Sequence, residues 1–147
     1  MTYQEKKSIV SLITAILIFG SYCAYMFPKA PGGADSTESF HYWGSFVIIL
    51  TLVSIAAHIL ISIIFNIAFR ITTGEKEPAF ADELDKLINL KATRNSFFVF
   101  VLGFLAAMGA LVNDQSSQVM FVILIAGGFI SDVTGSVTKL YHYRRGV

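Results

Sequence analysis

Residues 42–69 read YWGSFVIILTLVSIAAHILISIIFNIAF, and this stretch decides the fold because it contains no Lys, Arg, Asp or Glu. An α-helix needs about 20 predominantly apolar residues to cross the hydrocarbon of a bilayer. The stretch is longer than that, so the predicted helix either tilts or extends past the membrane. The whole chain agrees, because 54% of it is apolar and only 14% is charged, against roughly 45–50% and about 25% in soluble domains.

Three further stretches have the length and composition of membrane-spanning helices. Pro28 ends the first of them, and the polar turn 113–118 joins the last two, which we expect to form an antiparallel hairpin. The sequence therefore predicts an all-α protein with one membrane domain, residues 1–147, folded as an integral membrane four-helix bundle. The additional spans are residues 9–27, 97–112 and 119–141.

Positive charge predicts the orientation. The chain has eleven Lys and Arg residues, and all but Lys29 lie in the N-terminal tail, in the segment 70–96 between the second and third spans, or at the C-terminal end. Cytoplasmic loops carry an excess of Lys and Arg, so both termini are predicted to be cytoplasmic. Tyr42 and Trp43 are expected at the opposite membrane interface, where aromatic side chains gather.

The second part of the segment 70–96 is predicted to be helical. From residue 80 onward, after the breakers Gly74 and Pro78, apolar side chains recur at helical spacing. No breaker separates this amphipathic helix from the third span, so we expect one continuous or gently bent helix. Its first half is expected at or below the cytoplasmic membrane surface. The apolar face consists of Phe80, Leu84, Leu87, Ile88 and Ala92.

The charged face of the same helix is a candidate partner-binding surface. The alternative interpretation is a solvated face whose cations reach the lipid headgroups. The candidate residues are Asp82, Glu83, Asp85, Lys91 and Arg94.

The second span carries a stripe of polar residues. They follow one another at steps of three and four, which places them on one face of a helix. Such a face turns away from lipid, toward the bundle interior or a water-filled cavity. The stripe consists of Thr51, Ser54, His58, Ser62 and Asn66.

The fourth span carries Asp132, the one acid deep inside a predicted span. A carboxylate at membrane depth costs at least ~2.5 kcal/mol, so Asp132 needs a partner or a proton. Gly127, Ser131 and Gly135 form a row of small residues that lets another helix approach closely. Thr134 widens the polar face of this helix.

His58 and Asp132 are predicted to lie at similar depth. They precede Arg70 and Arg144, at the predicted cytoplasmic boundary, by the same number of residues, and each residue adds the same rise along a helix. Three interpretations are open: a proton-responsive site or ion pathway, a polar clasp that fixes helix register, or two groups that do not touch. In the last, Asp132 bonds to Thr, Ser or Tyr.

No cofactor or metal site is predicted. Haem between helices needs facing axial ligands, but His58 is the only deep histidine. The single cysteine forms no CxxC site, and no serine lies in a nucleophile elbow. Asp35, Glu38 and His41 offer a weak metal site outside the spans, but the favoured interpretation is a solvated loop. We therefore predict a protein that is not an enzyme, binds no cofactor and has no nucleic-acid partner.

The stretch from Asp82 to Ser96 is similar to a motif of an uncharacterised family of small prokaryotic four-span membrane proteins. The resemblance is carried by Asp82-Glu-Leu-Asp85, Leu87-Ile88, Lys91-Ala92, Arg94 and Ser96. That family has Asp-Glu-Arg-Asp at the first four positions, so Leu84 departs from it. The resemblance implies a bacterial inner membrane and, because some members are encoded beside helix-turn-helix regulators, a regulatory partner. It implies no mechanism.

Two functions are predicted. The first is a non-enzymatic regulatory or interaction module, embedded in the lipid bilayer, that binds a cytoplasmic or membrane protein through the helix at residues 80–95. The second is a small transporter or channel that uses the site at His58 and Asp132. One four-helix bundle has little room for a pathway, so this alternative requires a homo-oligomer.

Overall fold

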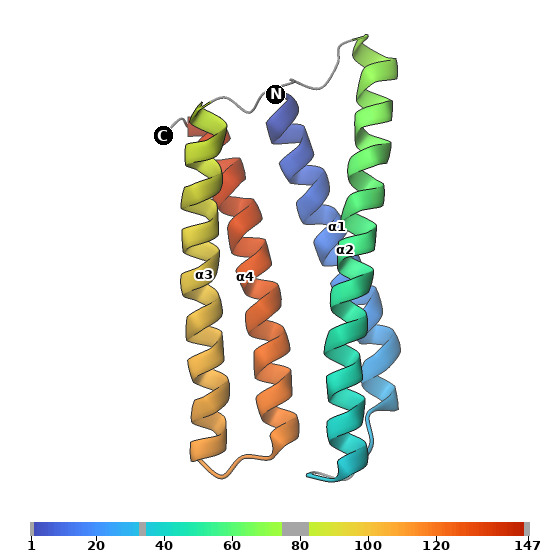
Figure 1. The fold of residues 1–147 in the computed structure, drawn as a ribbon, viewed down its shortest axis with the longest axis vertical. Coiled ribbons are helices and arrows are strands. Elements are labelled where there is room, and N and C mark those ends of the chain that lie inside the picture. Colours follow the sequence, from blue (N-terminus) through green and yellow to red (C-terminus); the bar gives the residue numbers. More distant parts are fainter. Residues whose placement is uncertain (1, 33–34, 75–82, 146–147) are drawn as a thin grey trace.

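The computed structural model describes residues 2–32, 35–74 and 83–145. Four of the helices are long and apolar enough to cross a membrane, which confirms the predicted number of spans. They run alternately up and down, and both chain termini lie at one end of the molecule (Figure 1). We call this the terminal end, and the opposite one the hairpin end. The helices are α1 (Tyr3–Met26), η1 (Phe27–Lys29), α2 (Thr37–Thr73), α3 (Glu83–Val112) and α4 (Ser117–Arg145).

Polar caps and a glycine fix where these helices begin and end. The Thr2 hydroxyl accepts from the Glu5 amide at 3.3 Å, and the Glu5 carboxylate accepts from the Thr2 amide at 2.8 Å, which is a capping box. The hydroxyl of Ser36 accepts from the Ser39 amide at the start of α2. Gly74 ends α2 with φ 69, a left-handed conformation that favours glycine.

α3 is one unbroken helix, so the helix predicted before the third span is continuous with that span. Of the apolar face predicted for its first half, Ile88 and Ala92 are buried, but Leu84 and Leu87 are 45% and 43% exposed. Phe80 lies outside the described residues. The buried face is therefore narrower than the sequence pattern predicts.

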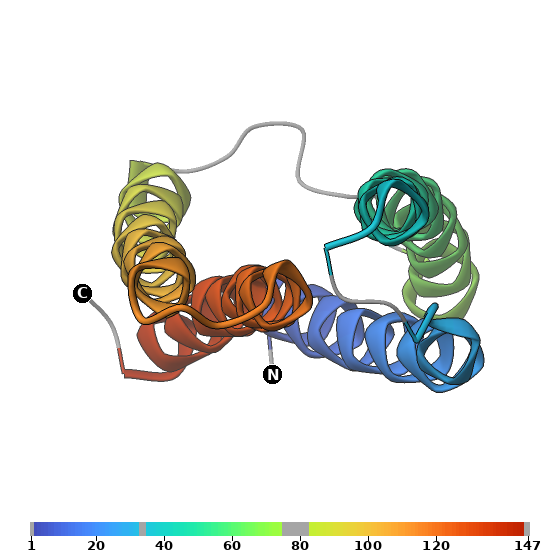
Figure 2. The ribbon, with the colours of Figure 1, turned by 90° about the horizontal axis from the view of Figure 1, so that it is seen from below.

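The four helices of the predicted bundle form an open arc (Figure 2). Viewed along the helices, their order is α3, α4, α1, α2 (Figure 2). Each packs on its neighbour in this order, α2 touches α4 only slightly, and α2 and α3 make no contact within the described residues. The arc therefore leaves a hollow between α2 and α3.

Small residues join α3 to α4, as the predicted hairpin requires. A Cβ added at Gly103 would lie only 2.8 Å from the Cα of Gly127, so the two backbones touch at this point. About two turns from Gly103 along α3 and about one turn from Gly127 along α4, toward the terminal end, two hydrogen bonds join the helices. The Ser96 hydroxyl donates to the Ser131 carbonyl at 2.9 Å, and the Ser131 hydroxyl donates to the Ser96 carbonyl at 2.8 Å. Close backbone contact and interhelical hydrogen bonds stabilise helix pairs in membranes.

Aromatic side chains join α2 to the other helices at the hairpin end. Trp43 and Phe46 are fully buried and form a core cluster with Ile125 of α4. The Tyr42 hydroxyl donates to the Met26 carbonyl of α1. Trp43 was expected at the membrane interface, and its depth in the membrane stays a prediction. Its side chain is enclosed by protein, because it packs in this cluster with aromatic and aliphatic groups of α1, α2 and α4.

Asp35 ties the segment before α2 to the start of α4. Its carboxylate accepts a hydrogen bond from the Ser117 backbone amide at 3.0 Å. Helix N-termini present unpaired amides and partial positive charge, which favour a carboxylate. The side chain and the backbone amide of Ser117 together lower the pKa of Asp35 from its ordinary value of 3.8.

Acidification is expected to weaken this link. The pKa of Asp35 is lower in the folded protein than in the unfolded chain. The hydrogen bond of this carboxylate therefore stabilises the fold fully above the unfolded-state pKa, and the stabilisation is lost as the pH falls through the folded-state pKa. Asp35→Asn is expected to remove this contribution from the pH dependence of the free energy of unfolding, measured in detergent. Asparagine suits the position because it tolerates the φ of 60 found there. The matched control is Asp114→Asn, on the hairpin turn with φ 57. An equal change in both variants would contradict the capping role.

Candidate functional site

A cavity of about 700 Å³ occupies the hollow of the arc. Its walls come from α2 and α4, while Ala15 and Phe19 of α1 and Phe100 of α3 complete the lining. We call this cavity the groove. It is predominantly apolar, and its volume lies in the range of roughly 300–1,000 Å³ that is typical of small-molecule sites.

His58 lies on the wall that α2 provides. Its Nδ1 is 2.8 Å from the Ser54 carbonyl oxygen one turn earlier in the helix. A carbonyl only accepts, so Nδ1 carries the hydrogen and donates it. In the neutral ring Nε2 is then the nitrogen that can accept a proton or a hydrogen bond. The intrahelical bond thus fixes both the orientation of the ring and its tautomer.

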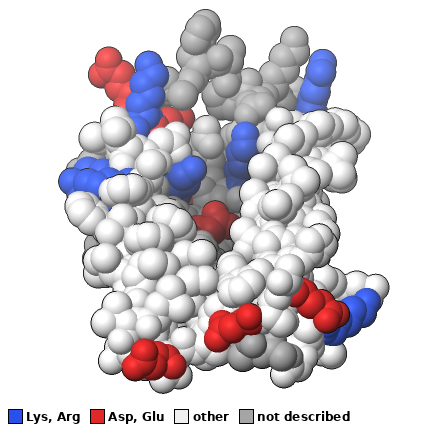
Figure 3. Space-filling view, turned by 60° about the horizontal axis from the view of Figure 1, so that its bottom comes forward, with Lys and Arg blue, Asp and Glu red and all other residues white. Residues whose placement is uncertain are grey.

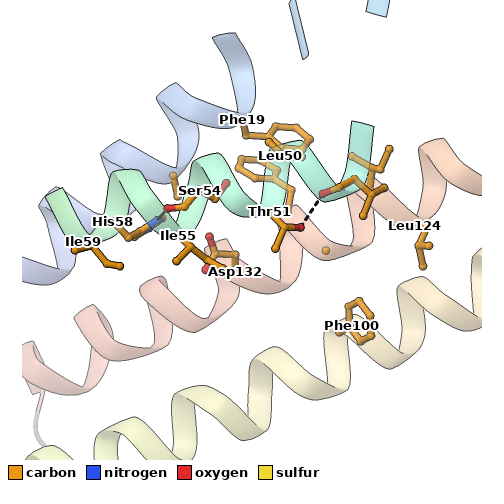
Figure 4. Close-up of a pocket in the computed structure, with 15 residues that line it drawn as sticks. Phe19, Leu50, Thr51, Ser54, Ile55, His58, Ile59, Phe100, Leu124 and Asp132 are labelled. Carbon is orange, nitrogen blue, oxygen red and sulfur yellow. Dashed lines mark hydrogen bonds between the residues drawn. The ribbon is translucent and has the colours of Figure 1, made fainter. Parts of the chain in front are cut away.

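Asp132 lies on the wall that α4 provides, and its side chain is exposed. Figure 4 shows it reaching from α4 toward the face of α2 that carries Ser54 and His58. Among the residues that the structure describes, none forms a hydrogen bond or ion pair with the Asp132 carboxylate. The carboxylate is therefore available to a proton or to a bound molecule.

The structure brings His58 and Asp132 to one cavity but does not join them. The only hydrogen bond of His58 within the described chain is the one to Ser54. This arrangement does not provide the predicted polar clasp, because a clasp needs direct contact. The two groups share the groove, and their similar depth in the membrane stays a prediction.

The rest of the predicted polar site divides between different surfaces. Thr51 and Ser54 line the groove, and the Thr51 hydroxyl is satisfied by the Val47 carbonyl at 2.8 Å. Ser62 lines a second, smaller cavity, and Asn66 accepts a hydrogen bond from the Tyr3 hydroxyl of α1. The predicted stripe of α2 therefore faces the groove only in its first half.

Ser131 and Thr134 do not line the groove. Ser131 faces α3, where its hydroxyl bonds to Ser96, and the Thr134 hydroxyl donates to the Ile130 carbonyl of its own helix at 2.7 Å. Gly128, next to Gly127, lies on the groove side with Asp132. Small residues thus pack α4 on α3 through one face and open space for the groove on another.

The second cavity, of about 220 Å³, lies between α1 and α2 on the other side of His58. Lys7 and Ser11 of α1 and Ser62 of α2 contribute its polar groups. His58 is the residue that lines both cavities. It therefore lies between the groove and this smaller, mostly apolar cavity.

The charged residues predicted to bind a partner differ in their surroundings. Asp85 is half-buried, accepts a hydrogen bond from Gln4 of α1 at 3.4 Å, and is hydrogen-bonded by Tyr143 of α4. It joins three helices of its own chain. Asp82 lies outside the described residues. The others are Glu83 and Arg94, which are exposed, and Lys91, which is half-buried.

Sequence reasoning missed the aromatic lining of the groove. Phe19 of α1 and Phe129 of α4 stack with ring centroids 3.9 Å apart and an interplanar angle of 8°. Phe100 of α3 lines the same cavity. In apolar spans a phenylalanine gives no signal that separates a lipid-facing side chain from a cavity-lining one, so these residues could only be found in three dimensions.

No protein-family model, no curated protein and no solved structure matches this chain.

Proposed function

We propose that this chain is a non-enzymatic protein of the bacterial inner membrane that binds and carries a small amphipathic molecule in the groove. His58 and Asp132 are its proton-accepting groups. The observation that carries the proposal is that these two residues, far apart in the sequence, line one apolar cavity of about 700 Å³. A site that combines apolar walls with a few convergent polar groups is typical of ligand binding. Ionisable groups at membrane depth typically mark substrate or proton pathways.

The proposed orientation has both termini in the cytoplasm. Lys and Arg side chains gather toward the terminal end of the molecule, and Figure 3 displays this asymmetry. The same view shows acidic surface in the hollow between the two halves of the arc. With this orientation the second cavity, which contains Lys7, lies between the groove and the cytoplasm.

Binding is tested with the neutral amphiphile N-phenyl-1-naphthylamine, added to the purified protein in a maltoside detergent. Trp43 is the only tryptophan and lies near the hairpin end of the groove, so it serves as an energy-transfer donor to bound probe. We expect energy transfer from Trp43 to the probe to saturate as the probe concentration rises. Gly128→Phe is expected to abolish this transfer because the new side chain fills the groove, and no atom lies within 4 Å of a Cβ added at Gly128.

The control is Gly20→Phe, which adds the same side chain at an open position of α1 outside the groove. It is expected to leave saturable transfer unchanged. Transfer that rises without saturation, or equally in both variants, would mean that the probe only partitions into detergent, and the proposal would be wrong.

A regulatory interaction module is the second proposal. The observation that favours it is the exposure of Leu84 and Leu87 beside Glu83 in the first turns of α3. A photoreactive residue at Leu87 is expected to cross-link to one discrete partner in the membranes of the native host. The control is the same residue at Leu102, which is 66% exposed in the middle of α3. Identical cross-links from both positions would contradict a docking surface.

A further inference from the structure

The charge of the groove limits what it can bind. Asp132 is the acid that lines it, and no described residue neutralises this carboxylate. An unpaired carboxylate at membrane depth costs at least ~2.5 kcal/mol, which a proton or a bound cation removes. An anionic ligand would add like-charge repulsion to this cost, and a neutral ligand would leave the cost in place. Charge complementarity therefore favours a cation.

The walls of the groove suit a cation with a large apolar body. Apart from Asp132, His58, Thr51 and Ser54, the side chains that line it are apolar. Phe19, Phe100 and Phe129 come from three different helices. The face of an aromatic ring attracts a cation within about 6 Å of its centroid, by up to ~2 kcal/mol when the pair is desolvated. A small hydrated metal ion would leave these surfaces unused.

We infer that the ligand of the groove is a lipophilic organic cation that competes with a proton for Asp132. The inference rests on the proposed function and adds the class of ligand to it. The cation lies between the stacked pair of Phe19 and Phe129 and the Asp132 carboxylate. Release follows when a proton takes the place of the cation on that carboxylate.

The proton competition involves few titratable groups. His58 from α2 and Asp132 from α4 are the titratable side chains of the groove lining, and the contributions of α1 and α3 are apolar. Lys7 of α1 shares the second cavity with His58. Protonation of His58 or of Asp132 makes the groove more positive, so both changes weaken binding of a cation as the pH falls.

The experiment compares two hydrophobic ions of matched size and opposite charge, tetraphenylphosphonium and tetraphenylborate. Each displaces N-phenyl-1-naphthylamine from the wild-type protein and from Asp132→Asn in neutral maltoside detergent. We expect the half-displacing concentration of the cation to rise at least tenfold in Asp132→Asn. That of the anion is expected to stay the same or to fall. Comparing each ion between two proteins cancels its partition into the micelle.

Asp114→Asn, on the hairpin turn outside the groove, serves as the control for loss of one negative charge. It is expected to leave displacement by both ions unchanged. In the wild type, displacement by the cation is expected to weaken as the proton concentration is raised, and displacement by the anion is not.

The outcomes separate the two levels of the proposal. One outcome is that the probe binds saturably while both ions displace it equally and Asp132→Asn has no effect. This result would overturn the inference that the ligand is a cation, but the groove would remain a binding site. The absence of saturable probe binding would overturn both the proposed binding function and the cationic ligand. If the protein then formed a dimer that Gly128→Phe prevents, the groove would be the contact surface for a second copy of the chain. If Asp132→Asn does not fold, the pH dependence and the preference of the wild-type protein for the cation decide the question.

Discussion

Trp43→Ala is expected to lower the free energy of unfolding by about 3 kcal/mol. Truncations of buried aromatic side chains typically cost ~3–5 kcal/mol through lost transfer energy and the cavity that remains. In a membrane, part of the transfer contribution is absent because separated helices expose the side chain to lipid. The cavity contribution remains, since Trp43 is 0% exposed and packs on Phe46 and Phe121.

The measurement is unfolding by sodium dodecyl sulfate in mixed micelles, followed by circular dichroism because the variant has no tryptophan. Phe40→Ala is the control, since Phe40 lies less than one turn away on the same helix and is 46% exposed. It is expected to change the unfolding free energy by less than about 0.5 kcal/mol. If the two variants lost the same stability, Trp43 would be an interfacial anchor and not a core residue.

Gly103→Ala is expected to destabilise the protein, although alanine is a better helix former than glycine. The new Cβ would lie 2.8 Å from the Cα of Gly127, and a backbone atom cannot move aside without separating α3 from α4. Overpacking of this kind costs about 1–3 kcal/mol, which exceeds the gain of up to ~1 kcal/mol from helix propensity. Gly127→Ala is also expected to destabilise the protein, because its Cβ would lie 3.0 Å from the Cα of Gly103.

Each of these glycines has a matched control on its own helix. Gly109 of α3 and Gly128 of α4 have no atom within 4 Å of an added Cβ. Gly109→Ala and Gly128→Ala are therefore expected to leave stability unchanged or to raise it. Equal unfolding midpoints for Gly103→Ala and Gly109→Ala would show that the two helices do not touch at Gly103.

The elements of the fold could be predicted from the sequence, but their arrangement could not. Composition and length identify the spans because each helix in a membrane must satisfy its own backbone hydrogen bonds. The hairpin of α3 and α4 could be predicted from the short polar turn between them and from the small residues at Gly127 and Ser131, which let another helix approach closely. The predicted four-helix bundle left open whether the helices close around a core or form an arc, since hydropathy does not report which apolar face meets protein and which meets lipid. For the same reason the sequence did not predict that Trp43 is buried in the protein core.

The candidate site could be predicted in part. Helical spacing and residue counting placed His58 and Asp132 at similar depth, and both line the groove. The same reasoning grouped Ser131 and Thr134 with them, but adjacent positions on a helix point about 100° apart, so Ser131 faces α3 while Asp132 faces the groove. Asp85 was assigned to a partner surface, although it joins α1 and α4 to α3.

The sequence by itself determined that the chain has four spans, because the cost of placing charge and unpaired backbone in hydrocarbon acts on each segment separately. Only the tertiary structure decided that the spans form an open arc with a groove. That outcome depends on contacts between segments: the backbone approach at Gly103 and Gly127, the core at Trp43, and the lack of contact between α2 and α3 in the described residues. Such contacts depend on the shapes of facing side chains, which no single helix specifies.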